Sequence, residues 1–345
     1  DREAAAARAA EARFVLEAAP AAAVAMPGQA PRYFSHPNYA NSPLPGNIVS
    51  EWNAIAQEIV QPMPMPGMPM TMGGTSMATA FVYLSYVQAA IYDALVAIEG
   101  GYQPYNLTLP SDPTASREAA VATAAYSVLV YFFPGDATLP AKYAASLAVI
   151  PDGVAKTAGI ALGEQAAAGI IALRTGDGLL APDTYTVLPP GPGIWEPTVL
   201  PDSTVVPPID PWMALLKPFT FAAPDQFRSL VGTPWALDSA EWAAQMNAVK
   251  DYGAVSAVRT PEQTSIAMFW TTNNVIQFNS AYRQIAADRG LNLVDTARLM
   301  AMGNMIGTDA LVACFDTKYT YSFWRPITAI RRADTDGTDL TVPDP

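Results

Sequence analysis

The sequence predicts an all-α protein, a large helical bundle connected by long loops rich in proline and glycine. Hydrophobic residues make up 51% of the 345 residues and charged residues only 14%, a balance typical of large buried helices rather than disorder. Long alanine-rich stretches with few helix breakers recur along the chain. Strand-like patterns are confined to short pieces around residues 183–206, so no large sheet is expected.

The first 50 residues are expected to form a helix and an extended wrap. Residues 2–19 are rich in alanine with interspersed Arg and Glu, which favours a helix, whereas residues 20–50 carry Pro, Gly and Asn. The single histidine, His36, lies in this wrap, where a hydrogen-bonded surface histidine is expected rather than a catalytic one. The chain begins at Asp1 rather than Met, which suggests a processed or tagged terminus. The location stays open, with a secreted or otherwise extracytoplasmic one favoured.

Residues 51–180 are interpreted as the first helical half. Helices are expected here at residues 49–60, 76–98, 115–132, 138–149 and 152–174. Asp152 is the expected N-cap of the last helix, and Gly176 lies close to where that helix should end. The Met- and Pro-rich segment at residues 62–72 cannot be regular helix, and adaptable packing is favoured there over a thioether site for a soft metal.

The helix expected at residues 76–98 contains the longest apolar stretch of the chain, which is nearly long enough to span a bilayer. Gln88 and Asp93 interrupt this stretch and its flanks lack cationic anchors, so a buried core helix is predicted instead of a membrane span. Because an unpaired buried carboxylate is costly, Asp93 is expected to pair with a cation or to cap a neighbouring segment of backbone.

Residues 181–222 are interpreted as a proline-rich connecting segment, and residues 223–345 as the second helical portion, which would continue in a missing C-terminal part. Helices are expected there at residues 223–231, 238–251, 260–289 and 293–325. Residues 260–263, Thr-Pro-Glu-Gln, form a capping box that begins the third of these helices. A break in the fourth helix is expected near Gly303 or Gly307.

Charge and cysteine content exclude two classes of protein. The 19 Lys and Arg residues are outnumbered by 31 Asp and Glu, for a net charge of −12. Affinity for nucleic acid rests on Lys and Arg that neutralise phosphates, so no nucleic-acid partner is expected. The single cysteine, Cys314, excludes an internal disulfide framework, and its apolar surroundings in the sequence predict a buried, inert thiol.

Lys318 and Arg325 are separated by six residues, and Pro326 follows the arginine. If a helix ran up to Pro326, this spacing would be almost two turns and would place both cations on one face. Lysine supplies a mobile point charge and arginine a planar fork of donors, so together they suit a tetrahedral oxyanion. The alternative is that both cations lie on a solvated helix face near its C-terminal dipole.

The surroundings of these two cations favour the oxyanion interpretation. Basic residues are scarce in this chain, yet four of them fall within fifteen residues: Lys318, Arg325, Arg331 and Arg332. Three aromatic residues lie between the first two cations: Tyr321, Phe323 and Trp324. Rings around the cations would exclude water and strengthen charge-assisted hydrogen bonds, and clustered cations focus the field of an acidic protein toward anions.

The Lys-x6-Arg-Pro segment resembles the first of three motifs shared by vanadium-dependent haloperoxidases and acid phosphatases related to type 2 phosphatidic acid phosphatase. Its flanks, residues 321–331, resemble the haloperoxidase-related branch, as do Tyr92-Asp93-Ala94, Ala97-Ile98-Glu99 and Phe269-Trp270-Thr271. The resemblance covers most of the chain from about Trp52 onward. It implies a helical bundle of the haloperoxidase and acid phosphatase type.

The resemblance implies that Lys318 and Arg325 bind equatorial oxygens of vanadate, or of phosphate at the same site. As a haloperoxidase, the protein would use vanadate and hydrogen peroxide to oxidise a halide to a hypohalous species. As a phosphatase, it would attack a phosphate ester with a histidine and form a phospho-enzyme. The flanking residues favour the haloperoxidase branch. A third alternative, from another class, is a non-catalytic structural or storage protein that keeps the fold and half of the anion site.

The second and third motifs of the family, a Ser-Gly-His segment and an Arg followed by a His, do not occur before the last residue, Pro345. The resemblance implies histidines as the axial partner of the oxyanion and as an acid–base group, so no catalytic residue is assigned within this sequence. Three explanations remain open: cleavage with the remainder still bound, a truncated sequence, or loss of catalysis. A companion C-terminal fragment of the same precursor is favoured, because a bundle cut through its core would expose a large apolar surface. The oligomeric state stays open.

Overall fold

The computed structural model describes residues 47–60, 75–182, 184–199, 203, 205–253, 258–270 and 273–344. The chain divides into two compact units, Asp1–Ser42 and Pro43–Pro345, and all the described residues belong to the second. The helix predicted at residues 2–19, most of the extended wrap with His36, and the segment at residues 62–72 lie outside the described residues.

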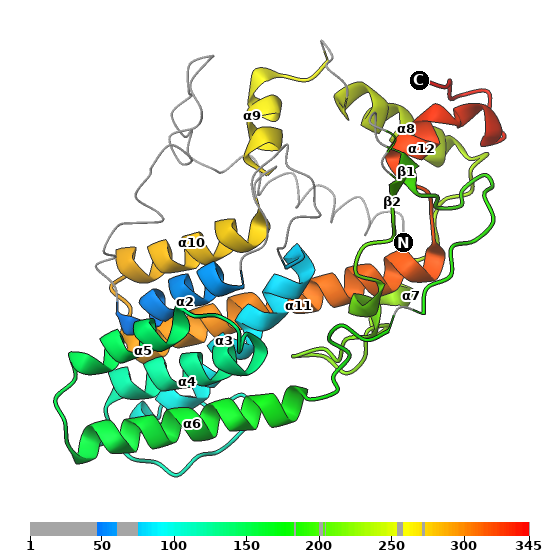
Figure 1. The fold of residues 1–345 in the computed structure, drawn as a ribbon. Helices are drawn as coiled ribbons and strands as arrows, with labels where there is room; N and C mark the ends of the chain where they lie inside the picture. The colour runs from blue at the N-terminus through cyan, green and yellow to red at the C-terminus, as the bar shows by residue number, and fades with distance from the viewer. Residues whose placement is uncertain are drawn as a thin grey trace. The chain divides into compact units, whose positions relative to one another are not determined.

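The described part of the second unit is mostly helical, which confirms the predicted all-α class (Figure 1). Its first five helices are α2 (Ile48–Ile59), α3 (Met77–Glu99), α4 (Arg117–Phe132), α5 (Leu139–Ala148) and α6 (Val154–Arg174). Each agrees with a predicted helix to within two residues at both ends. α3 packs against α2, α4, α6 and the later helix α11 (Leu293–Tyr321) and so forms the centre of the bundle.

Side-chain caps begin three of these helices. Asn47, Ser76 and Ser116 each accept a hydrogen bond from a backbone N–H in the first turn of α2, α3 and α4, respectively. The prediction that Asp152 caps α6 is wrong, because the N-cap is Gly153. The Asp152 carboxylate instead pairs with the ammonium of Lys156 at 2.8 Å, so it is not available to the backbone N–H groups of the first turn.

α3 is the buried core helix that the sequence predicts. It is long and apolar enough to cross a membrane, with a mean hydropathy of 1.5, yet its apolar window is entirely buried within the protein. The Asp93 carboxylate accepts backbone N–H bonds from Tyr105, Asn106 and Leu107 at 2.6–3.4 Å, which confirms the predicted capping of a neighbouring segment. Burial raises the pKa of Asp93, and these three bonds oppose that rise.

α4 and α6 approach each other very closely along a stripe of small residues. A Cβ atom added at Gly159 would lie 2.3 Å from the carbonyl oxygen of Ser116, and one at Gly163 would lie 2.6 Å from that of Ala120. Both glycines lie on α6 one turn apart, and both clashes would be with backbone atoms of or beside α4. Only a residue without a Cβ atom permits this spacing between the two helix axes.

The second portion of the unit alternates loops and helices. Its elements are β1 (Thr198–Val199), β2 (Val205–Val206), the 3₁₀ helix η2 (Pro211–Leu215), α7 (Arg228–Val231), α8 (Ala240–Gly253), α9 (Pro261–Phe269), α10 (Asn274–Asp288), α11, α12 (Pro326–Arg331) and the 3₁₀ helix η3 (Ala333–Thr335). β1 and β2 form a two-stranded antiparallel ladder, within the region where the sequence predicts short strands.

Several predictions for this portion are wrong. The helix predicted at residues 223–231 forms only at Arg228–Val231, as α7. The helix predicted at residues 260–289 is two helices: its capping box is present, but α9 ends at Phe269 and Asn273 caps α10 by accepting from two backbone N–H groups. The predicted break near Gly303 or Gly307 does not occur, since α11 is continuous. A Cβ atom would lie 2.5 Å from the Tyr282 ring at Gly303 and 3.0 Å from the Phe81 ring at Gly307. These glycines therefore permit close packing and do not interrupt the helix.

A buried chain of amides joins α2, α10 and α11. The Asn53 side chain donates to Asn279 at 2.8 Å, and Asn279 exchanges hydrogen bonds with Asn304 at 3.0 Å. Arg283 donates to Asn53 and Gln57. Burial lowers the pKa of Arg283 to about 10, because neutral amides compensate its charge less well than water does. The network fixes the register of α11 against the first half of the bundle.

The proline-rich segment is fastened to α11 through Asp309. The Asp309 carboxylate is 4% exposed and accepts the backbone N–H groups of Phe219 and Thr220 at 2.7 and 2.8 Å, together with the Thr220 hydroxyl. Close by, the guanidinium of Arg174 pairs with Asp177 at 2.7 Å and lies 3.9 Å from the centre of the Phe219 ring. These contacts hold the last residues of the segment, whereas its earlier residues Tyr185 and Trp195 contact the turn after α11.

Candidate functional site

α11 ends at Tyr321, which makes the expected single helix up to Pro326 wrong. Ser322 adopts the left-handed conformation, with φ 45° and ψ 40°, and its N–H donates to the Lys318 carbonyl at 3.0 Å. Arg325 is extended, with φ −77° and ψ 154°, because the ring of Pro326 disfavours a helical conformation in the residue before it. Lys318 thus lies in the last turn of α11, and Arg325 is the N-cap of α12. The two cations do not share a helix face.

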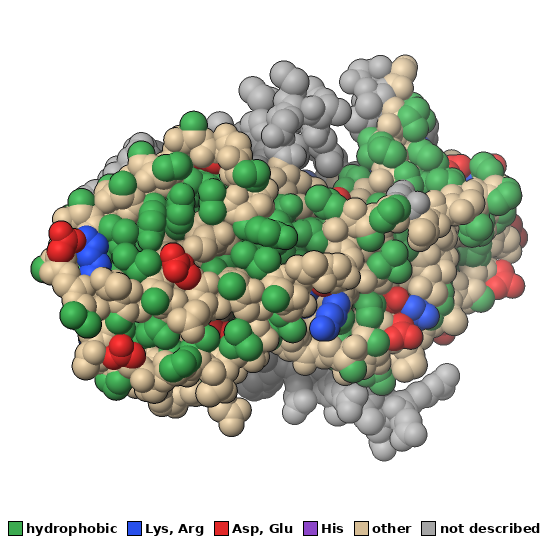
Figure 2. Space-filling model, turned by 60° about the horizontal axis from the view of Figure 1, so that its bottom comes forward, with side chains coloured by type: hydrophobic (Ala, Val, Ile, Leu, Met, Phe, Trp, Pro, Cys, Tyr) green, Lys and Arg blue, Asp and Glu red, His purple; other side chains and the backbone are tan. Residues whose placement is uncertain are grey.

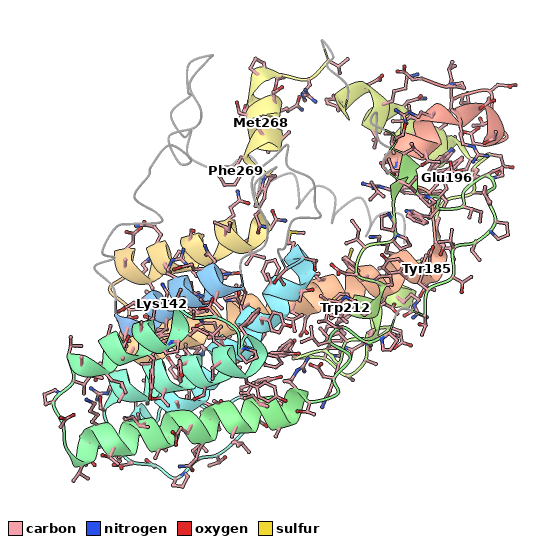
Figure 3. The ribbon with its side chains drawn as sticks, in the orientation of Figure 1. Lys142, Tyr185, Glu196, Trp212, Met268 and Phe269 are labelled. Carbon is pink, nitrogen blue, oxygen red and sulfur yellow. The ribbon has the colours of Figure 1, made fainter. Side chains whose placement is uncertain are left out.

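The turn between the two cations is held by the proline-rich segment. The Ser322 carbonyl accepts the N–H of Trp195 at 2.7 Å, and the Trp324 N–H donates to the Gly193 carbonyl at 3.0 Å. The hydroxyls of Tyr185 and Ser322 lie 3.0 Å apart. In Figure 3 the labelled Tyr185 lies at the end of α11. The site is therefore built from two stretches about 130 residues apart in sequence.

Lys318 and Arg325 are electrostatic neighbours. Burial lowers the pKa of Lys318, and the positive charge of Arg325 lowers it further, while Cys314 and Asp210 oppose the shift. The Lys318 ammonium lies 4.6 Å from the ring centre of Phe315 and 5.0 Å from that of Tyr319. These rings shield one side of the ammonium from water although the residue as a whole is exposed.

Neither cation has a carboxylate partner among the described residues. Arg325 donates one bond, to the Thr198 hydroxyl at 3.5 Å, and Lys318 makes only ring contacts. The neighbouring arginines differ, since Arg332 pairs with Glu196 at 3.1 Å and Arg228 forms a two-pronged pair with Asp316. Lys and Arg side chains are few among neutral and hydrophobic ones on the face shown in Figure 2. Two neighbouring cations that pair with no carboxylate in the described part leave a local excess of positive charge for an anion, which Asp210 offsets in part.

A second, smaller hydrophobic core includes residues on both sides of Arg325 in the chain. It comprises Trp242, Met246, Trp324, Ala329 and Ala333, which come from α8, α12 and the residues around them. The Trp242 indole N–H donates to the buried Asp336 carboxylate at 3.0 Å. The Trp242 ring stacks on that of Trp324, with centres 5.7 Å apart. This core fixes the start of α12 and hence the backbone that carries Arg325.

A cavity of about 440 Å³ opens beside Lys318. It is lined by Val231, Gly232, Thr233, Pro234, Trp235, Trp242, Thr317, Lys318, Tyr321 and Phe323. The sequence interpretation missed its wall at residues 231–235, because no local pattern relates those residues to the end of α11. The one available signal was the pair of tryptophans, Trp235 and Trp242, in the loop and helix that precede the capping box.

The prediction of a buried thiol at Cys314 is wrong. Cys314 is exposed on α11, one turn before Lys318. The apolar neighbours in its sequence pack on the other side of the helix, where Val312 is fully buried. A one-dimensional apolar run does not reveal which side of a long helix faces the core.

The residues present fit part of an oxyanion site. A lysine and an arginine without acid partners match the donor set that a tetrahedral oxyanion requires. The sequence has one histidine, His36, and it lies outside the described residues. The described residues thus supply cationic donors and no imidazole.

The fold is that of the vanadium-dependent haloperoxidases. The structure resembles a bacterial vanadium-dependent iodoperoxidase with a TM-score of 0.63 and 19% identity, covering 84% of this chain and 72% of that one. It also resembles a bacterial vanadium-dependent chloroperoxidase in apo form (TM-score 0.59, 18% identity, 76% of this chain and 67% of that one). The holo form gives a TM-score of 0.59 and 16% identity, with coverages of 80% and 69%.

A family model matches a short part of the chain that contains both cations. Residues 298–339, which include both Lys318 and Arg325, match the second helical-bundle domain of VCPO. No curated protein matches the chain. Residues 298–339 thus resemble that domain, and the solved structures show the fold that the chain shares with vanadium haloperoxidases.

Proposed function

We propose that this chain forms part of a vanadium-dependent haloperoxidase-like enzyme, in which Lys318 and Arg325 bind vanadate. The main observation behind this proposal is that the two neighbouring cations have no carboxylate partner among the described residues. Both cations lie in the segment that matches the second helical-bundle domain of VCPO. Bound vanadate would supply the activation of hydrogen peroxide that lets a halide be oxidised. The similarity of the solved haloperoxidases supports this activity over phosphate-ester hydrolysis at the same site.

The two cations have distinct tasks in this proposal. Lys318 presents an ammonium whose surrounding rings lower the local dielectric constant, so each of its hydrogen bonds to an anion is stronger than in water. Arg325 presents a planar fork of donors, one of which contacts the Thr198 hydroxyl, and its other N–H groups would donate to the oxyanion. Both stabilise negative charge on the oxyanion without transferring a proton.

Completion of the site requires imidazole groups from elsewhere. We expect a companion polypeptide, the C-terminal fragment of the same precursor, to supply a Ser-Gly-His-like segment and a further His. Intact mass measurement and peptide sequencing of the purified material would reveal it as a second component. Halide oxidation with vanadate, peroxide and bromide is expected only when that component is present.

Replacing either cation should weaken oxyanion binding. A charge-assisted hydrogen bond contributes about 1.5–3 kcal/mol, so Lys318→Ala and Arg325→Ala are each expected to reduce vanadate affinity by about ten- to a hundredfold. Isothermal titration with vanadate measures the effect. The matched controls are Lys142→Ala and Arg117→Ala, which remove cations engaged with Glu58 and Glu99 on other helices. Equal losses in controls and site variants would contradict the proposal.

Oxyanion binding should also weaken as the solution becomes alkaline. Because burial and Arg325 lower the pKa of Lys318 from 10.5, its positive charge is lost at a lower pH than that of an ordinary lysine. Binding should be full below that lowered pKa and decline as pH rises through it. Sulfate is the suitable probe, because its own charge is constant over this range. In Lys318→Arg, which stays protonated, the decline should disappear; an identical decline in this variant would exclude Lys318 as its source.

A further inference from the structure

Two arginines are buried among the described residues, and their partners differ. Arg174 is 4% exposed and forms an ion pair with Asp177 at 2.7 Å. Arg283, on α10, is 5% exposed, and every described side chain to which it donates a hydrogen bond is neutral. A charge removed from water is costly unless an opposite charge compensates it. Arg283 is therefore a buried cation that lacks a counter-ion in the described part of the chain.

The guanidinium of Arg283 also has N–H groups that the described residues do not use. An arginine carries five N–H donors. Nη1 donates to the side chains of Asn53 and Gln57, and Nη2 donates to the Ser280 hydroxyl at 3.1 Å. No described residue accepts from Nε, and the second hydrogen of Nη2 has no acceptor there either. Nε and Nη2 lie on the same edge of the planar guanidinium.

Another arginine of this protein holds an anionic group with the same edge. Arg228 donates from Nε and Nη2 to the two carboxylate oxygens of Asp316. Two donors that lie side by side suit an anion, because both can point to it at once. In Arg283 this edge has no acceptor from Nε among the described residues, yet the side chain is charged at neutral pH, since its lowered pKa is still about 10.

The surroundings of Arg283 fix it in place and favour a small ion. Asn53 is fully buried and donates to Asn279 at 2.8 Å, so the acceptor of Nη1 is itself held by the amide network. Gln57 and Ser280 are partly exposed, which shows that the guanidinium lies close to the protein surface. Because only 5% of Arg283 is exposed, a compact ion from solvent is favoured over a larger oxyanion or an organic acid.

We propose that Arg283 binds a small monovalent anion, of the size of chloride, at its Nε–Nη2 edge. One negative charge neutralises one guanidinium, so no acidic residue is needed among the neutral amides around it. This site is separate from the oxyanion site. Tyr282, the preceding residue, contacts Gly303 on α11. Lys318 lies fifteen residues beyond that glycine, about 22 Å along the helix axis, so the inference does not depend on the proposed function.

Thermal unfolding in chloride and in gluconate, at equal ionic strength, tests this site. Gluconate is too large for it, so chloride should raise the melting temperature of the wild-type protein by about 2 °C in a saturable manner. Arg283→Met removes the charge and should abolish this rise. Arg289→Met is the matched control, because Arg289 is exposed at the end of the same helix, and it should keep the rise. Lys318→Ala should keep the rise as well.

Gln57→Glu tests the same site with the arginine in place, and so covers the case in which Arg283→Met does not fold. Gln57 accepts from Arg283 at 3.2 Å, so a glutamate there would supply the missing negative charge. This variant should melt at a higher temperature than the wild type in gluconate and should not respond to chloride. Gln165→Glu, at an exposed position of α6, is its control and should respond to chloride as the wild type does.

Three results would overturn this inference. The first is a wild-type protein that melts at the same temperature in chloride and in gluconate. The second is a chloride effect that persists in Gln57→Glu, and the third is one that Lys318→Ala removes, because the ion would then lie elsewhere. None of these results bears on vanadate binding by Lys318 and Arg325, and a protein that binds no vanadate would still be expected to show the chloride effect.

Discussion

Replacing Gly163 by alanine is expected to lower the free energy of unfolding by about 3 kcal/mol. The new Cβ atom would lie 2.6 Å from the Ala120 carbonyl oxygen, 2.7 Å from the Thr123 Cβ and 2.9 Å from the Ala124 nitrogen. Two of these are backbone atoms of α4, so no side-chain rotation relieves the clash and the two helices must separate. The separation would loosen the buried contacts of both helices with α3.

The appropriate control for this variant is Gly253→Ala. Gly253 is also helical, in the last turn of α8, and a Cβ atom there meets nothing within 4 Å. Alanine has the higher helix propensity by up to about 1 kcal/mol, so the control should be neutral or slightly stabilising. Thermal unfolding followed by circular dichroism compares the two variants. A transition for Gly163→Ala at or above that of the wild type would show that α4 and α6 are not packed as closely as described.

Replacing Asp309 by alanine is the second change with a large expected effect, a loss of about 3 kcal/mol in unfolding free energy. The carboxylate accepts the backbone N–H groups of Phe219 and Thr220. The bond from Phe219 is buried, whereas Thr220 is exposed. Without it, the Phe219 N–H is buried and unsatisfied, which costs about 1–3 kcal/mol, and Thr220 loses two further hydrogen bonds. The link between the proline-rich segment and α11 would also be lost.

The matched control for this variant is Asp334→Ala, because Asp334 is exposed and accepts no hydrogen bond from any described residue. It should leave unfolding unchanged to within about 0.5 kcal/mol. Limited proteolysis gives an independent measurement, since release of residues 216–221 from α11 should create new cleavage sites there in Asp309→Ala alone. Equal protease resistance in the two variants would contradict the fastening role of Asp309.

Local signals account for most of the helices that the sequence predicts correctly. The capping box at Thr260 forms with both of its hydrogen bonds. Gly176 is near the end of α6 and has a positive φ of 72°, as expected for a helix terminator. In these cases a few neighbouring residues determine the structure, so a one-dimensional pattern is sufficient.

Predictions failed where a distant contact decides the local conformation. Whether Gly303 breaks α11 depends on the Tyr282 ring across from it. Where α11 ends depends partly on Ser322, whose carbonyl is bound by Trp195 in the other stretch of chain. The motif identifies Lys318 and Arg325 as a candidate pair. The sequence does not show that the two residues lie on different helices, or that residues 231–235 form the cavity wall. Both features depend on contacts between residues that are more than 80 positions apart in the sequence.

Because α11 is continuous, a small tilt at one of its residues displaces the far end of the helix. Its 29 residues run from contacts with the main bundle to the turn that carries Lys318 (Figure 1). Gly303 lies fifteen residues before Lys318, a distance of about 22 Å along a helix axis. A tilt of roughly 5° at that glycine would move the lysine end by about 2 Å, more than an anion site tolerates. Substitutions that disturb the Gly303–Tyr282 contact should therefore displace Lys318, although they contact no atom of the site.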